Sequence, residues 1–101
     1  MEHINQVILL GNLTRDPEVQ PIGNSQLCKF TLAVNGIPKD GQPDVLFMDI
    51  TTWGDLAAKA ATLHKGQQCT VTGRLKQDKW QDKTTGVERS KYNVVATEVV
   101  V

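Results

Sequence analysis

An alternation of apolar and polar residues with a period of two recurs along this chain, and it restricts the fold to one built mainly from half-buried β-strands. Between residues 26 and 35, for example, Phe30, Leu32 and Val34 lie on one face while Lys29 and Thr31 lie on the other. Strands are predicted where this pattern, or a continuous apolar run of strand length, occurs: residues 6–14, 26–35, 45–53, 68–80 and 88–101.

One segment has helical instead of strand spacing. Leu56, Ala60 and Leu63 recur at helical intervals in residues 54–63, and Gly66 follows just beyond the end. The helix therefore lies between the third and fourth predicted strands. This layout predicts an all-β chain with the five-stranded Greek-key barrel of the OB fold, because a β-sandwich would need about seven strands.

The length and composition indicate one soluble domain covering residues 1–101. Eleven basic and eleven acidic residues give a net charge of zero, so any site for a polyanion must arise from local placement. The N-terminus has no secretory signal or membrane span, which predicts a cytoplasmic protein with no membrane partner. Cys28 and Cys69 stand at apolar strand positions without metal-ligand spacing, and we expect reduced core residues.

Catalytic motifs are not recognisable in the sequence. His3 and His64 are the two histidines, and neither has a clear acid or nucleophile partner. We therefore expect no enzyme activity, no catalytic residue, no metal site and no cofactor.

Three aromatic residues occupy polar-face positions of strands whose apolar face is already complete: Phe47, Trp53 and Trp80. Exposed rings on a sheet suit unstacked nucleobases, because every base offers a π-face. Alternatively, such rings pack under loops or in a subunit interface, and strand alternation alone does not separate these possibilities. Basic residues scattered along the strands are equally consistent with a solvated face.

Several sequence blocks resemble the bacterial single-stranded DNA-binding proteins and follow in the same order as in that family. They span nearly the whole chain: Asn5-x-Val7-x-Leu9-x-Gly11-Asn12-Leu13-Thr14-Arg15-Asp16-Pro17-Glu18, Phe30-x-Leu32-Ala33-Val34-Asn35, Trp53-Gly54-x-Leu56-Ala57, Lys65-Gly66, Val71-x-Gly73-Arg74-Leu75 and Trp80-x-Asp82-Lys83-x-x-Gly86.

This resemblance implies an OB-fold protein that coats single-stranded DNA without marked sequence preference during replication, recombination and repair. It implies a homotetramer, with a dimer as the other possibility, in the bacterial cytoplasm at the nucleoid. The family's stacking aromatics fall on Phe47, Trp53 and Trp80, and its phosphate-contacting cations on Lys65 and Lys76. The full set of predicted phosphate contacts is Lys29, Lys65, Arg74, Lys76, Lys79 and Lys83.

The chain departs from the family pattern in three places. The loop Gly36-Ile37-Pro38-Lys39 lacks an aromatic residue that many relatives have. Asp49, Asp55 and Asp78 stand where relatives often carry neutral or basic residues, which predicts weaker binding. The sequence ends without the acidic C-terminal tail through which relatives recruit replication and repair proteins, so those partners are expected only if the native protein carries one.

Two other functions remain open at this point. The short chain also resembles the primosomal OB proteins, which are dimers that act mainly as protein-interaction scaffolds. An RNA-binding OB domain is the other alternative, because base stacking does not distinguish RNA, which carries a 2′-hydroxyl group, from DNA.

Overall fold

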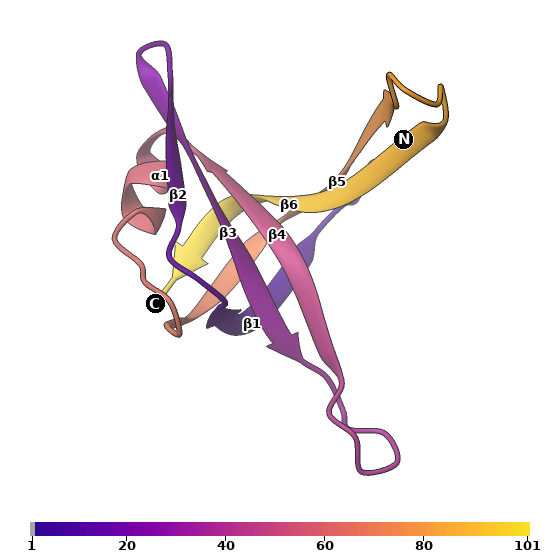
Figure 1. The fold of residues 1–101 in the computed structure, drawn as a ribbon. Helices are drawn as coiled ribbons and strands as arrows, with labels where there is room; N and C mark the ends of the chain where they lie inside the picture. The colour runs from indigo at the N-terminus through magenta and orange to yellow at the C-terminus, as the bar shows by residue number, and fades with distance from the viewer. Residues whose placement is uncertain (1) are drawn as a thin grey trace.

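The structure, a computed structural model, describes residues 2–101. Within these residues it has six β-strands and one α-helix (Figure 1), namely β1 (Val7–Leu13), β2 (Glu18–Ile22), β3 (Ser25–Asn35), β4 (Val45–Trp53), α1 (Gly54–Ala60), β5 (Gln68–Gln81) and β6 (Glu88–Val100). The predicted all-β class, with a short helix before the fourth predicted strand, is confirmed.

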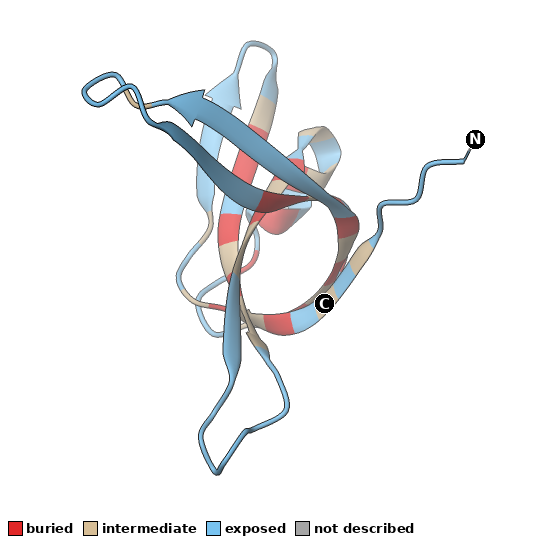
Figure 2. Ribbon diagram, turned by 90° about the vertical axis from the view of Figure 1, so that its right-hand side faces the viewer, coloured by how far each residue is buried: buried red, intermediate tan, exposed pale blue. Residues whose placement is uncertain are grey.

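The strands form one sheet that closes on itself. Their order is β1-β5-β6-β4-β3-β2, and an additional pairing between β1 and β3 completes the ring. All pairs are antiparallel except β4 and β6, which run parallel where Ile50 lies beside Val94. In Figure 2 the buried residues lie in this ring and on the helix, while the ends of the hairpins that project from the ring are exposed. This arrangement agrees with the OB barrel predicted from the sequence.

Two details differ from the predicted elements. The strand β2 was not predicted because all five of its residues are exposed, so it has no apolar face, and because it contains Pro21. The helix α1 ends at Ala60 instead of residue 63, although Leu63 is buried beyond its end. Within residues 2–101 no helix has the length and apolar character needed to cross a membrane.

The barrel interior is filled mainly by small and aliphatic side chains, with Phe30 as its aromatic member. Cys28 and Cys69 are buried and form no disulfide, as predicted, and burial raises the pKa of both thiols. Thr52 is also buried, and its hydroxyl donates a hydrogen bond of 2.9 Å to the Cys28 carbonyl oxygen. The polar group inside the barrel is therefore satisfied.

Close backbone contact closes the barrel at two glycines. A Cβ atom at Gly11 would collide with the carbonyl oxygen of Ala33, and one at Gly73 would collide with that of Val95 and lie 2.9 Å from the Cα atom of Ala96. The pairing of β5 and β6 also shifts beside Gly73, and this shift leaves Thr97 outside the register. A side chain at either glycine would push neighbouring strands apart.

We expect Gly73→Ala to lower the free energy of unfolding by about 1–3 kcal/mol, because the added methyl group meets backbone atoms that cannot move independently. Urea unfolding monitored by circular dichroism would measure this. Gly36→Ala is the matched control, since a Cβ there meets the Asp44 carboxylate, the mobile end of an exposed side chain, at 2.8 Å. Equal unfolding midpoints for the two variants would contradict the packing argument.

Candidate nucleic-acid interface

An open groove of about 430 Å³ runs across β3, β4, β5 and β6. Arg15 and Glu18 contribute to one side from the segment that joins β1 to β2 and from the start of β2. The other lining residues come from the four strands: Leu27, Lys29, Phe30, Thr31, Asp49, Ile50, Thr51, Trp53, Lys76, Asp78, Lys91, Asn93 and Val95. The groove therefore combines the exposed ring of Trp53 with several charged side chains.

Strand register explains why residues distant in sequence meet in this groove. In the antiparallel pair of β3 and β4, Lys29 lies opposite Thr51 and Leu27 lies opposite Trp53. The parallel contact of Thr51 with Val95 then brings β6 alongside β4. Because side chains alternate between the two faces of a strand, the polar positions of all these strands share the outward face.

All three predicted stacking residues are exposed. Phe47 is 64% exposed, Trp53 49% and Trp80 47%, so none of these rings is needed to fill the barrel. Trp53 lies in the groove, whereas Phe47 lies further along β4 and Trp80 lies on the projecting β5–β6 hairpin. The rings are thus spread along the surface and do not form one cluster. Their outward placement agrees with strand alternation, and their role in stacking stays a prediction.

The predicted cations divide into two groups. Lys29 and Lys76 line the groove together with Trp53. The other four lie outside it, in positions that differ. Lys65 is held in the loop after α1, where its backbone N–H donates to Asp16 at 2.8 Å, and Lys83 lies in the hairpin turn. Arg74 and Lys79 are exposed residues of β5, and alternation places Lys79 on the face opposite Trp80.

Two groove cations, Arg15 and Lys91, are absent from the predicted phosphate contacts. The sequence did indicate that the Lys91 side chain points outward, because Lys91 alternates with the apolar face formed by Tyr92, Val94 and Ala96. Arg15 stands after the end of β1, where no periodic pattern reports which way a side chain points.

Hydrogen-bonded side chains form the polar floor of the groove. The Asp49 carboxylate accepts a 2.9 Å hydrogen bond from the Thr31 hydroxyl and pairs with the Lys91 ammonium at 2.8 Å. Lys91 holds the pKa of Asp49 below its ordinary value, with a smaller contribution from Thr31 and against a partial opposing effect of burial. Asp49 is therefore ionised at neutral pH.

A second set of contacts links β4, β6 and β5 across the same floor. Thr51 donates to the side-chain oxygen of Asn93 at 3.2 Å, and the Asn93 amide donates to Asp78 at 2.9 Å. Asp78 also lies 3.5 Å from the ammonium of Lys76. Asp49 and Asp78 are thus each held in place by a neutral partner and lie beside a lysine.

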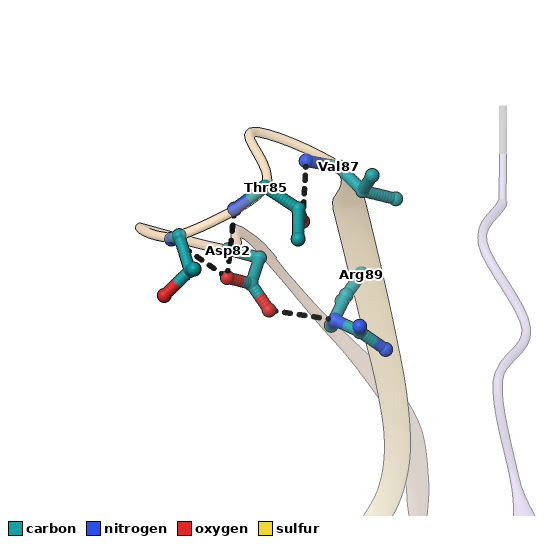
Figure 3. Close-up of polar contacts among 5 residues, drawn as sticks. Asp82, Thr85, Val87 and Arg89 are labelled. Carbon is teal, nitrogen blue, oxygen red and sulfur yellow. Dashed lines mark hydrogen bonds and ion pairs between the residues drawn. The ribbon is translucent and has the colours of Figure 1, made fainter.

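The turn of the β5–β6 hairpin is organised by Asp82 (Figure 3). One carboxylate oxygen accepts the backbone N–H groups of Thr84 at 2.8 Å and Thr85 at 3.2 Å, and the other accepts the Arg89 Nε–H at 3.1 Å. Arg89 lies opposite Trp80 in the strand pairing, so Asp82 holds a guanidinium group beside this exposed ring. These donors, with Thr84 the largest, hold the pKa of Asp82 below its ordinary value.

We expect the amide resonances of Thr84 and Thr85 to shift as the pH falls below about 4, the ordinary range of an aspartate. Because the pKa of Asp82 is lowered in the folded state, its contribution to stability is complete above the ordinary value and is lost as pH falls through the lowered one. Asp82→Asn keeps a side-chain oxygen that can accept these hydrogen bonds but cannot titrate. The Thr84 and Thr85 amide resonances of this variant should therefore stay constant over the same pH range. Wild-type resonances that also stay constant would contradict this assignment.

Comparison with known proteins identifies the family. The model of the Single-strand binding protein family matches residues 4–101. The single-stranded DNA-binding protein of Thermosynechococcus vestitus is 44% identical over 89 residues, covering 86% of this chain and 72% of that protein. The protein of the same name from Treponema pallidum is 38% identical over 104 residues, covering 98% of this chain and 58% of that protein.

Single-stranded DNA-binding protein 2 of Clostridium acetobutylicum is 40% identical and covers 95% of this chain and 74% of that protein. For the relative from Deinococcus radiodurans the chain spans only 33% of the length, so several of these relatives are considerably longer. The match nevertheless includes every strand of the barrel and the residues that line the groove. The chain belongs to the single-strand binding protein family.

Proposed function

We propose that this protein binds single-stranded DNA without marked sequence preference, by stacking bases on Phe47, Trp53 and Trp80 and by contacting phosphates with nearby cations. It acts without catalysis and protects the strand during replication, recombination and repair in the bacterial cytoplasm. The observation that carries the proposal is that all three rings are about half exposed or more, from 47% to 64%, on the outer surface of a closed barrel.

Exposed aromatic rings favour a ligand with flat apolar faces. Each base stacked on such a ring contributes about 1–3 kcal/mol, and the contribution depends little on which base is present. The three rings come from different parts of the sheet, so a flexible single strand could follow them in turn, whereas the stacked bases of a duplex could not. This separation supports a single-stranded ligand.

The groove supplies contacts for the backbone of that strand. Lys29 and Lys76 line the same groove as Trp53, so a base stacked on the indole would place its phosphates in the groove that both lysines line. We add Arg15 and Lys91 to these contacts because they line the same groove. Contacts outside the groove are proposed for the parts of the strand that run past it, through Lys65, Arg74, Lys79 and Lys83.

We also propose that the protein self-associates through β1. On one side β1 pairs with β5 along most of its length, but on the other its pairing with β3 is limited to Asn12 and Leu13. Its backbone edge before Asn12 is therefore open, and the outward side chains Ile8 and Leu10 are 63% and 55% exposed. An open edge beside exposed aliphatic side chains favours pairing with a second copy, which supports the expected dimer or tetramer.

Titration with oligothymidine tests the stacking residues. We expect Trp53→Ala and Trp80→Ala each to weaken binding by about 1–3 kcal/mol, since each removes one platform. Fluorescence anisotropy of a labelled oligonucleotide measures the affinity of each variant. Val87→Ala is a matched control for Trp80→Ala, because it shortens another exposed apolar side chain in the β5–β6 hairpin. Wild-type affinity in both tryptophan variants would remove the stacking role.

The same titration separates the alternative functions. An RNA of the same base sequence that binds as tightly as the DNA would favour an RNA-binding domain. A wild-type protein that binds neither strand would favour a protein-interaction scaffold.

Sedimentation velocity tests the interface at β1. We expect Leu10→Asp to lower the mass of the assembly, because a carboxylate would be buried against the apolar face of the second copy. Val19→Asp is the control, since Val19 is an aliphatic residue of similar exposure, 49%, on β2. A wild-type protein that sediments as a monomer at micromolar concentration would contradict the proposed association.

A further inference from the structure

The charges that line the groove nearly cancel. Four cations, from Arg15, Lys29, Lys76 and Lys91, are accompanied by three carboxylates, from Glu18, Asp49 and Asp78. A site that binds phosphates through electrostatic attraction alone would not benefit from carboxylates, because each one repels the ligand. The position of these carboxylates therefore needs a separate explanation.

Two of the carboxylates are paired with groove lysines. Asp49 lies 2.8 Å from the Lys91 ammonium, and Asp78 lies 3.5 Å from that of Lys76. The carboxylates themselves are fixed by neutral partners, Thr31 for Asp49 and Asn93 for Asp78. The lysines, by contrast, are 62% and 56% exposed along their side chains, and the long aliphatic stem of lysine is flexible. Each pair thus has one fixed and one movable member.

We propose that Asp49 and Asp78 compete with DNA phosphates for Lys91 and Lys76, so that strand binding exchanges each internal ion pair for a lysine–phosphate pair. This inference rests on the proposed single-stranded DNA binding. The exchange is feasible because an ion pair between exposed side chains contributes little to stability.

The competition changes which interaction selects the ligand. Lysines that are already paired give less net attraction to a phosphate backbone, and a larger share of the affinity then comes from base stacking. The two aspartates thereby act as specificity determinants, since they disfavour polyanions that cannot place bases on the aromatic rings. Duplex DNA is such a polyanion, because its bases are stacked on one another.

A double-mutant cycle between Asp49 and Lys91 tests the exchange. We expect Asp49→Asn to tighten binding of oligothymidine about two- to fivefold at low salt, because Lys91 then meets the phosphate without first giving up an ion pair between exposed side chains. The asparagine retains an oxygen that can accept the Thr31 hydrogen bond. In a Lys91→Gln background the same substitution should have a much smaller effect, because no lysine remains to be released.

Glu18→Gln is the matched control in both backgrounds. Glu18 lines the same groove, and within residues 2–101 it forms no ion pair with Lys91 or Lys76. Its effect should therefore be the same whether or not Lys91 is present. Thermal unfolding of each variant verifies that the barrel stays folded.

The possible outcomes separate this inference from the proposed function. If the wild type binds oligothymidine but Asp49→Asn does not tighten binding, or tightens it equally without Lys91, the competition is wrong and the DNA-binding proposal stands. If neither the wild type nor any variant binds oligothymidine, the proposed function itself fails, and the competition with it.

Discussion

The structure depends on the close packing of a narrow closed barrel. Its interior is filled by small and aliphatic side chains, and Gly11 and Gly73 let backbones approach so closely that even a methyl group would not fit. A barrel this tightly packed has no space for further large rings. Phe47, Trp53 and Trp80 are therefore left on the outer surface, where they are available to a ligand.

The same alternation that fills the barrel also builds the groove. Each strand that contributes an apolar residue to the interior presents the next residue outward, and the curved sheet brings these outward residues of β3, β4, β5 and β6 together. The result is a groove that contains the indole of Trp53 together with lysines whose charge is largely balanced by Asp49 and Asp78. Affinity in this groove consequently depends on bases as well as phosphates. This balance fits a chain whose net charge is zero.

The spacing of apolar residues was sufficient to predict the main strands and the helix, and strand alternation also predicted the outward placement of the three rings. It failed for β2, whose five residues are all exposed and therefore carry no apolar face. It also could not show which cations meet in the groove, because this depends on how the strands pair. Lys29 and Lys76 line one groove with Trp53, whereas Lys65 lies outside it in the loop where its backbone N–H donates to Asp16. Arg15 lies outside any periodic segment, and Lys91 was recognisable only as an outward residue of a strand.

The central claim is that nucleobases stack on these exposed rings, and the indole N–H resonances of Trp53 and Trp80 test it most directly. In a ¹⁵N-labelled wild-type protein titrated with oligothymidine, the account predicts that both indole resonances shift and saturate together. Backbone resonances of buried residues such as Val71 should change much less. Indole resonances that stay in place while the oligonucleotide binds elsewhere would contradict the account.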